Sequence, residues 1–552
     1  MSKGLILCGV TDQNYSEYKF IAVTNLCLRL ALEKQGIETE DLWGLSVEID
    51  SVKVLRCIDD GLHQEAAFSS EMKWAPLALV RIIRRYLHYA QYKYRLQSWI
   101  VGKSINEIVL SSGDDSDLVA AATDVAKEFS LKISILEGEF DVYSGLDPFL
   151  YNEILPNYQS IDPSFITYIL AKIVKYFDIR TMYEPYTNLP IFNRGLTTFK
   201  WWKTITFFET LIEKTLLLIK KKQSQIKINP LKLTTGAYQK NDFILKKDLW
   251  KSFDENELRV INSGLSEFFK THNLKKIDRI VDALKLFFST SGIKRLIIMD
   301  SQIAHCRLLA FSARSSGVFV DYLPHGIVIE DQTTSTQTIF SPHRVLAWNE
   351  AAQKRYETYG ISSVAISHPR NLMNSIKTTL IKTPSLSIKK CLVLFSCNDP
   401  LYLDALERDF LDISEALNSL GIPSQWKLHN SGSILHDARM DVLKKLENLL
   451  NISIDFVDQA LDTIEVFKNY DFIVIGRLTS AIYEAAHLRV PFIVYKGHIE
   501  RMGAFDGVKM PYASSVIGLK REIEEFDMHS FFDTCQKIDN SLVCNKSPLN
   551  LG

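Results

Sequence analysis

Short apolar runs alternate with longer amphipathic segments along most of the chain. Apolar runs of strand length occur within residues 105–113, 293–301, 318–326, 389–399 and 470–476. Segments with helical spacing follow them, and Gly317 and Gly360 stand where two of these helices should end. Strands of this kind, separated by helices, predict parallel sheets covered on both faces and joined by right-handed crossovers.

This alternation forms two series, and a polar segment separates them. The segment "EDQTTSTQTIFSP", residues 330–342, is rich in Thr and Ser and predicts a linker. We therefore predict an α/β protein with a first domain at residues 1–335 and a second at residues 336–552. Residues about 150–290 are less regular and mainly helical, and we interpret them as an insertion in the first domain. Facing α/β domains place their ligand sites at the carboxyl ends of the strands, in the cleft.

Composition narrows the classes of function. The 552 residues exceed what one hydrophobic core can organise, and the 46% hydrophobic and 23% charged residues are typical of globular proteins. A net charge of −1 provides no global attraction to nucleic acid. The eight cysteines form no CxxC pair and have no zinc-ligand spacing. We expect no metal, no disulfide framework and a cytoplasmic location.

Three segments bear on membranes and anionic partners. The N-terminal run within residues 1–13 predicts a first strand and not a signal peptide. Residues 199–222 are the most apolar helical stretch, but lysines and glutamates interrupt them too often for a membrane span. We interpret them as a packing helix, with peripheral contact to the inner face of the cytoplasmic membrane as the alternative. Residues 81–95 mix basic and aromatic side chains and predict a solvated helix face, with glycan or lipid head-group binding as the alternative.

The last strand–loop–helix unit carries candidate nucleotide ligands. The strand ends at Gly476, and Thr479 and Ser480 then open a helix that contains Glu484. Hydroxyls and free N–H groups at a helix start suit a phosphate, and a carboxylate one turn later suits a ribose diol. The simpler alternative is a capped helix in which Glu484 interacts with the helix dipole.

Basic side chains stand at the ends of two further strands. Lys427 and His429 are two residues apart, so they share one face of a strand. His368 and Arg370 follow another strand. Lys, His and Arg together suit a phosphate or a sugar carboxylate. The alternatives are a solvated strand end for the first pair and a turn before Pro369 for His368.

Asp300 and His325 follow two successive strands of the first series. In a parallel sheet both strand ends face the same cleft, where a carboxylate and an imidazole suit nucleophilic and acid–base roles. Gly326 permits close backbone approach to a ligand. The alternative is that Asp300 caps the following helix and His325 serves a turn.

Residues about 290–500 resemble the GT-B glycosyltransferases. The segment "YEAAHLRVPFIV" after a Thr/Ser turn is similar to their donor-nucleotide loop, and residues 345–370 resemble the start of their second domain. In many bacterial surface-polysaccharide transferases that run ends in Gly-Asn-Pro-Arg, whereas here it ends in Ser-His-Pro-Arg. The resemblance implies a GT-B fold of two Rossmann-like domains that needs no metal at the donor phosphates.

The basic groups and the Asp300–His325 pair resemble bacterial retaining β-Kdo transferases. That resemblance implies CMP-Kdo as donor, no cofactor, and a lipopolysaccharide or capsule glycan as acceptor. Asp300 would then act as nucleophile. Alternatives are a CMP-sialic acid transferase, a UDP- or GDP-sugar transferase, a CDP-polyol phosphotransferase, and a non-catalytic nucleotide-binding scaffold that partners other polysaccharide assembly proteins.

Overall fold

The computed structural model describes a large part of the chain. The described residues are 2–7, 9–10, 15–24, 26–42, 51–68, 74–111, 116–136, 141–142, 168, 171–172, 175–176, 181–184, 245, 247–271, 274–298, 304–324, 342–358, 360–366, 388–395, 403–428, 433–458, 461, 463–476, 479, 481–497, 505 and 508–541.

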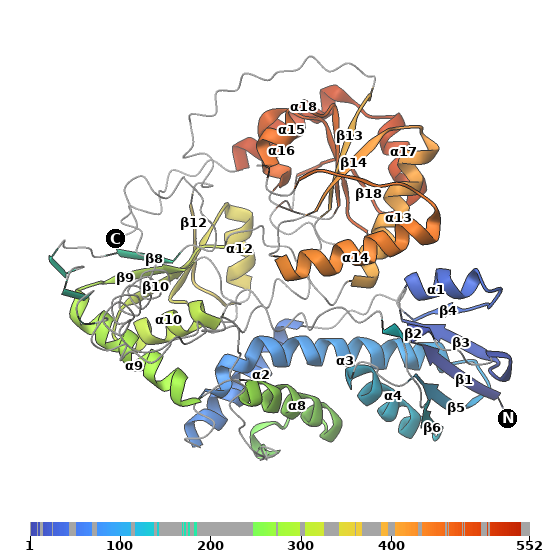
Figure 1. The fold of residues 1–552 in the computed structure, drawn as a ribbon. Coiled ribbons are helices and arrows are strands. Elements are labelled where there is room, and N and C mark those ends of the chain that lie inside the picture. Colours follow the sequence, from blue (N-terminus) through green and yellow to red (C-terminus); the bar gives the residue numbers. More distant parts are fainter. Residues whose placement is uncertain are drawn as a thin grey trace, which may run out of the picture.

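Parallel strands build three sheets, which Figure 1 shows as separate groups of arrows. The N-terminal sheet contains β1 (Ser2–Leu7), β3 (Phe20–Val23), β4 (Glu40–Asp41), β5 (Ile105–Leu110) and β6 (Lys132–Ile135). Its order is β4-β3-β1-β5-β6, so the chain builds outward from β1 on one side and then crosses back to build the other side. Such a doubly wound sheet is covered on both faces. The small strands β2 (Gly9–Val10) and β7 (Asp141–Val142) pair separately.

Alternation along the strands of the N-terminal sheet sends side chains to two cores. Leu5 and Val109 pack with α1 (Leu26–Glu33) on one face. Ile6 and Ile108 pack on the other face, with α3 (Leu79–Ile100) and α4 (Ser116–Glu128). This two-sided burial is what a strand of period two requires when helices cover both faces.

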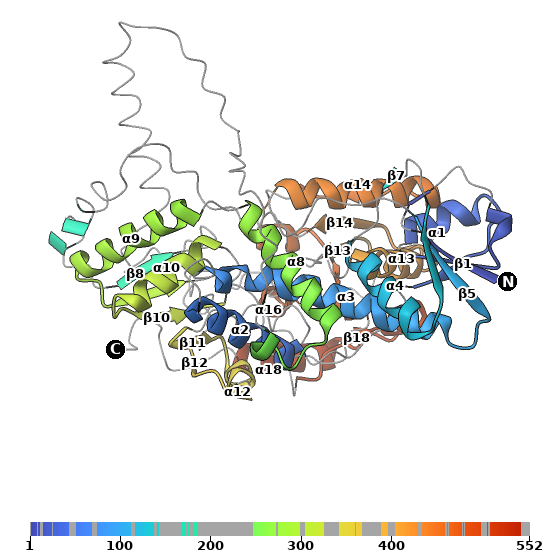
Figure 2. The same ribbon diagram turned by 90° about the horizontal axis from the view of Figure 1, so that it is seen from below.

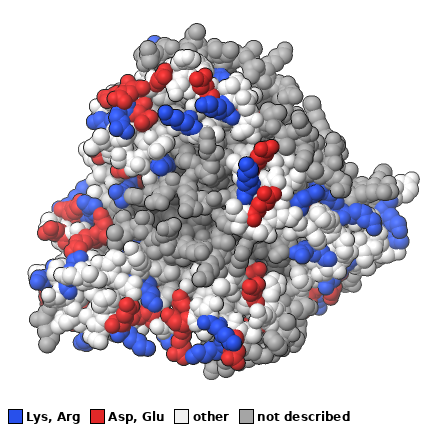
Figure 3. All heavy atoms as spheres, turned by 180° about the vertical axis from the view of Figure 1, so that it is seen from behind, with Lys and Arg blue, Asp and Glu red and all other residues white. Residues whose placement is uncertain are grey.

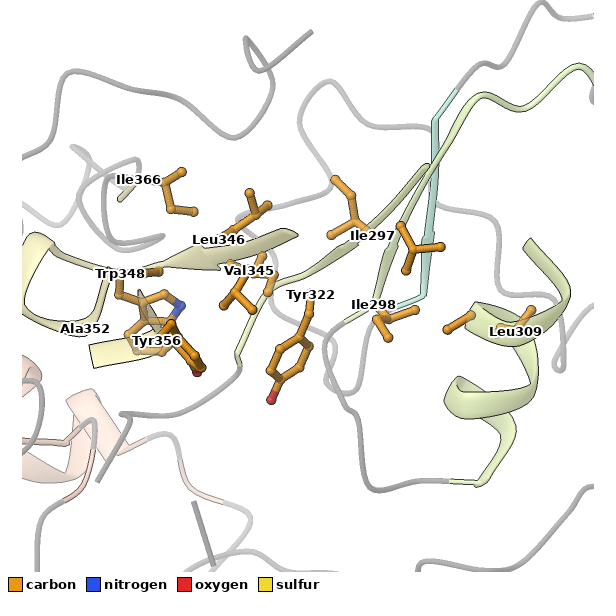
Figure 4. Packing of buried hydrophobic residues seen from close by; sticks show 14 of the residues in the cluster. Ile297, Ile298, Leu309, Tyr322, Val345, Leu346, Trp348, Ala352, Tyr356 and Ile366 are labelled. Atoms are coloured by element: carbon orange, nitrogen blue, oxygen red, sulfur yellow. The ribbon is translucent and has the colours of Figure 1, made fainter. Parts of the chain in front are cut away.

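The middle sheet has five parallel strands in chain order. They are β8 (Thr181–Glu184), β9 (Arg295–Ile298), β10 (Phe319–Tyr322), β11 (Arg344–Ala347) and β12 (Ser363–Ala365). In Figure 4, Ile298 and Val345 point to the face where Leu309 of α10 (Ala304–Ser315) and Tyr356 of α12 (Glu350–Thr358) lie, whereas Ile297 points to the opposite face. Both helices therefore cover the same side of this sheet.

One buried charge ties three strands of the middle sheet together. Asp321 of β10 is fully buried, and it accepts hydrogen bonds from Arg295 of β9 and, at 2.8 Å, from Nε of Arg344 of β11. A buried carboxylate is tolerated when it is paired in this way, and removing one partner leaves an uncompensated charge. The three side chains therefore favour this strand pairing over alternatives.

Strand pairing runs across the predicted domain boundary. Asp321 and Tyr322 of β10 pair with Arg344 and Val345 of β11, so residues on both sides of the 335/336 boundary belong to one sheet. The change of sheet comes later, between Ala365 and Cys391. The first half of the chain also forms two sheets and not one, because β5 and β9 join different neighbours.

The C-terminal sheet is the second doubly wound sheet. Its order is β15 (Asp455–Phe456), β14 (Ser424–Leu428), β13 (Cys391–Phe395), β16 (Phe472–Gly476), β17 (Phe492–Tyr495) and β18 (Tyr512–Ala513). Its helices are α13 (Leu403–Ser419), α14 (Ser433–Leu450), α15 (Thr463–Phe467), α16 (Ala481–Leu488), α17 (Val516–Glu524) and α18 (Met528–Ser541). Every residue of β13 is buried, and Cys391 acts as a small core residue whose thiol pKa is raised to about 12 by burial. The predicted α/β class with parallel Rossmann-like sheets is confirmed.

The three sheets are packed together and do not stand as isolated bodies. Leu26 and Cys27 of α1 belong to the same buried cluster as Phe410 of α13 in the C-terminal part. Another cluster is shared by the middle and C-terminal sheets. Figures 1 and 2 show α3 running from the N-terminal sheet toward the middle sheet, with α2 (Ser51–Phe68) and α8 (Glu255–Thr271) beside it. The helix α9 (Leu274–Ser291) covers the middle sheet.

Residues 81–95 were predicted to form a solvated helix face, and this prediction is wrong for two of the arginines, which are buried. Arg81 is 3% exposed and Arg85 is 5% exposed. Nε of Arg85 donates to Asp117 of α4 at 3.0 Å, and the same guanidinium forms an ion pair with Glu267 of α8. Carboxylates from two neighbouring helices thus compensate charges that the sequence pattern assigned to solvent.

Charge and hydropathy add two findings about the surface. On the face in Figure 3, acidic and basic side chains lie interspersed over the upper and lower parts of the described surface. Among the helices that the structure describes, none combines the length and the apolar character needed to cross a bilayer. Residues 199–222, which raised the question of a membrane contact, lie outside the described residues.

Candidate functional site

The crevice outside β13 and β16 is where the C-terminal sheet should bind a ligand. The chain runs from β13 to β14 and β15 on one side of the sheet and then crosses back to β16 on the other side of β13. At such a switch point two loops diverge, and doubly wound sheets bind ligands in the crevice between them. The carboxyl ends of the two strands are adjacent, because Phe395 pairs with Gly476.

Gly476 ends β16, as the sequence predicted. Its lack of a side chain allows β16 to pack closely against the end of β13. A Cβ atom at this position would lie 3.0 Å from Cδ2 of Phe395 and 3.1 Å from the carbonyl oxygen of Leu394. Both distances are tighter than ordinary contacts, so any larger residue would push against the backbone of β13. The glycine keeps the two strand ends close at the switch point.

Lys427 lies on β14, one residue before the strand ends. It pairs with Leu394 of β13 and is only 5% exposed, so the alternative of a solvated strand end is wrong for this residue. Its Nζ donates to the carbonyl oxygen of Asp458, which follows β15, at 3.4 Å. The ammonium group is therefore held at the carboxyl side of the sheet. His429, predicted on the same strand face, lies outside the described residues.

Thr479 lies two residues before the helix α16. Its Oγ1 accepts a hydrogen bond from the N–H of Ala481 at 3.1 Å, and its carbonyl oxygen accepts from Ile482 at 3.2 Å. The alternative in which Ser480 caps the helix stays a prediction, because Ser480 lies outside the described residues. The hydroxyl hydrogen of Thr479 is still available, because this cap uses only the oxygen as an acceptor.

Glu484 lies in the first turn of α16 and is 7% exposed. A carboxylate in the first turn interacts favourably with the positive end of the helix dipole. Burial of a carboxylate is costly unless polar groups surround it, so this side chain is not an ordinary solvated first-turn residue. Lys427 lies near the carboxyl end of β14, and Thr479 and Glu484 follow the carboxyl end of β16, with β13 between the two strands.

The carboxyl edge of the middle sheet contacts this same helix. Asn349, just after β11, donates from Nδ2 to the hydroxyl of Tyr483 at 3.3 Å, and the rings of Trp348 and Tyr483 are 6.4 Å apart. Asn349 also caps α12, because its Oδ1 accepts from the N–H of Ala352 at 2.7 Å. Burial raises the pKa of Tyr483, so its hydroxyl stays protonated. The ends of the two sheets therefore face each other.

Sequence reasoning missed Asn349 and Tyr483 as interface residues. The sequence contains a local signal for Asn349: it directly precedes the helical segment "EAAQKRYET", and Asn is a favoured N-cap residue. Nothing in the sequence indicated that the side-chain amide of Asn349 would also donate a hydrogen bond to Tyr483. That contact joins residues 134 positions apart.

The two strands that precede Asp300 and His325 lie side by side. Ile298 at the end of β9 pairs with Tyr322 at the end of β10, and the N–H of Leu323 donates to the carbonyl of Ile298 at 2.8 Å. The predicted adjacency of these strands in one parallel sheet is confirmed. Seven of the predicted site residues lie outside the described residues: Asp300, His325, Gly326, His368, Arg370, His429 and Ser480.

The described residues offer no group of three His, Cys, Asp or Glu side chains that could hold a metal ion. Tyr495, in the C-terminal sheet, has a strongly shifted pKa. Burial and a hydrogen bond to Asp412 raise the pKa of Tyr495, at the end of β17. This tyrosine therefore acts as a hydrogen-bond donor and not as a base.

Comparison with known proteins yields structural likeness only. No protein-family model and no curated protein matches the chain. UDP-GlcNAc 2-epimerase from Neisseria meningitidis bound to UDP-GlcNAc is 13% identical, with a TM-score of 0.36, and the match covers 49% of this chain and 80% of that one. The S. aureus MnaA-UDP co-structure is 13% identical, with a TM-score of 0.35 and coverage of 50% and 80%.

Glycosyltransferases also occur among the similar structures. The lipopolysaccharide outer core galactosyltransferase WaaB is 13% identical, with a TM-score of 0.30, and the match covers 49% of this chain and 78% of that one. MurG from Acinetobacter baumannii is 11% identical, with a TM-score of 0.31 and coverage of 48% and 74%. At these scores the likeness assigns no activity to this chain.

Proposed function

We propose that this protein is a GT-B-type glycosyltransferase that binds a nucleotide sugar at the switch point of its C-terminal sheet. The observation that carries the proposal is the contact between Asn349 and Tyr483. It brings the carboxyl edge of the middle sheet against α16, the helix that also holds Glu484. Two facing carboxyl edges are the arrangement in which a donor on one sheet reaches an acceptor on the other.

The nucleotide half of the proposal uses the described side chains. Lys427 supplies a positive charge for a phosphate, and the Thr479 hydroxyl can donate to a phosphate oxygen. Glu484 can accept two hydrogen bonds from a ribose diol. His429 and Ser480 complete the predicted nucleotide contacts, and His368 and Arg370 provide further charge for a phosphate or a sugar carboxylate.

The preferred donor is CMP-Kdo, and the preferred outcome is retention of configuration. Asp300 attacks the anomeric carbon, the bond to the phosphate oxygen breaks, and CMP leaves with the electron pair. An acceptor hydroxyl then displaces Asp300 while His325 takes its proton, which regenerates the carboxylate. Gly326 leaves room for backbone contact with the leaving phosphate. The side-by-side ends of β9 and β10 support this pairing of roles.

The covalent step can be tested by intact-mass measurement after incubation with CMP-Kdo. We expect a mass increase of one Kdo residue on the wild-type protein and none on Asp300→Ala. Asp282→Ala on α9 is a matched control, since that aspartate is exposed and lies outside the predicted site. Turnover of CMP-Kdo that persists unchanged in Asp300→Ala would rule out this nucleophile. A scaffold would bind nucleotide and consume no donor with any acceptor.

A further inference from the structure

A cavity of about 740 Å³ lies at the N-terminal sheet, whereas the candidate nucleotide site lies at the C-terminal sheet. It is lined by residues 15–21, apart from residue 17, and by residues 37–40. These segments lead into β3 and β4 and include the first residues of both strands, so the cavity lies at the amino edge of the sheet. Its volume is in the range of small-ligand pockets, about 300–1,000 Å³.

Aromatic side chains form one side of this cavity. Tyr15 and Tyr18 are half-buried, and both pack with Ile37 against the cluster between the sheet and α1. The backbone fixes their spacing, because the N–H of Tyr18 donates to the carbonyl of Tyr15 at 3.1 Å. Each ring is thus anchored in the core and turns part of its surface to the cavity.

A polar cluster holds Glu40, which also lines the cavity. Glu40 accepts from Nζ of Lys103 at 2.9 Å and from the indole nitrogen of Trp99 at 3.1 Å. Trp99 lies directly on the backbone of β1, since a Cβ on Gly4 would be only 2.8 Å from its ring. The carboxylate is therefore positioned before any ligand arrives, which lowers the cost of binding.

Charge around the cavity selects the ligand class. Glu40 is balanced by Lys103, and the remaining charged lining residues are Lys19 and Glu38, one of each sign. This lining concentrates no positive charge for a phosphate. Half-buried rings beside hydroxyls and carboxylates suit a ligand with apolar C–H faces and many hydroxyl groups. We propose that this cavity binds a neutral carbohydrate segment, at a site separate from the nucleotide crevice.

Ligand-observed saturation-transfer NMR on the full chain tests this proposal with cellotriose, maltotriose and chitotriose, and with sialyllactose as an anionic comparison. We expect saturation transfer to at least one neutral trisaccharide and binding that is not displaced by CMP. Glu38→Ala and Ser16→Ala should each weaken binding about fivefold, the loss of one hydrogen bond. Both side chains are exposed, so these variants should fold normally.

Tyr18→Ala should abolish the signal, whereas Tyr512→Ala on β18, a tyrosine that is 48% exposed, should leave it unchanged. The proposal is overturned if no neutral trisaccharide receives saturation, if only sialyllactose does, or if the exposed-residue variants bind as wild type. Displacement by CMP would also overturn it, because the two sites would then be one. None of these results depends on whether the chain transfers Kdo.

Discussion

At the scale of single residues, burial changes what several side chains can do. Lys427 and Glu484 look like solvated or capping residues in the sequence, yet they are 5% and 7% exposed. Arg85 looks like part of a basic surface, yet Asp117 and Glu267 enclose it. Sequence reasoning could place all three on the correct elements, because element type follows from local spacing. It could not predict their burial, because burial depends on residues far away in the sequence. The two partners of Arg85, for example, are 32 and 182 residues away.

Asp59 on α2 gives a prediction for pH dependence. Burial is the largest cause that raises the pKa of this carboxyl to about 6, while His63 opposes the shift and Asp60 adds to it. A carboxyl with a raised pKa in the folded state favours folding below its unfolded pKa and loses that contribution as pH rises through about 6.

Asp59→Asn should therefore raise the free energy of unfolding at pH 8 by on the order of 2 kcal/mol relative to wild type. The difference should shrink as the pH falls toward 4. Urea denaturation at pH 4, 6 and 8 measures it, with Asp60→Asn as a control because Asp60 is exposed. An equal effect of Asp59→Asn at all three pH values would contradict this reading of the site.

At the scale of elements, most strands and helices agree with the pattern of apolar positions. The predicted helix ends at Gly317 and Gly360 are confirmed by positive φ angles of 74° and 70°. The predicted strands at residues 318–326 and 389–399 are found as β10 and β13. Sheet membership was harder to predict, because buried parallel strands look alike and their pairing depends on crossovers. That is why the sequence pattern separated β10 from β11, although the two strands pair in one sheet.

The bridge between α16 and the end of β11 should be measurable as a coupling energy. Tyr483→Phe removes the acceptor for Asn349 and should lower the free energy of unfolding by about 1 kcal/mol. Asn349→Ala should cost about 2 kcal/mol, because it also removes the cap of α12. A double-mutant cycle by urea denaturation should show coupling of about 0.5–1 kcal/mol. Strict additivity would mean that the two sheet edges are not joined by this bond.

At the scale of the whole molecule, the N-terminal sheet is fastened to the C-terminal part through α1. Cys27 is 1% exposed and shares a cluster with Phe410. The two-domain prediction did not include this contact, because it assigned the N-terminal strands to a single first sheet. The contact makes all three sheets part of one packed unit, in which the facing edges of the middle and C-terminal sheets keep a fixed relation.

Cys27→Asp should break this contact by burying a carboxylate without a partner. We expect a loss of about 3 kcal/mol or more in the free energy of unfolding. Lys34→Asp, at an exposed position just after α1, is the control for the added charge. The midpoint of urea denaturation reports the effect, and an unchanged midpoint for Cys27→Asp would show that the N-terminal sheet unfolds independently of the rest.

We propose that the switch point of the C-terminal sheet binds a CMP-activated sugar. Thermal shift with CMP, UDP, GDP and CDP tests it directly, because a ligand that binds only the folded state raises Tm. CMP should give the largest rise in the wild-type protein, and the rise should be lost in Glu484→Gln and kept in Glu524→Gln, where the glutamate is exposed. An absent shift with CMP, or the same shift in both variants, would contradict the account.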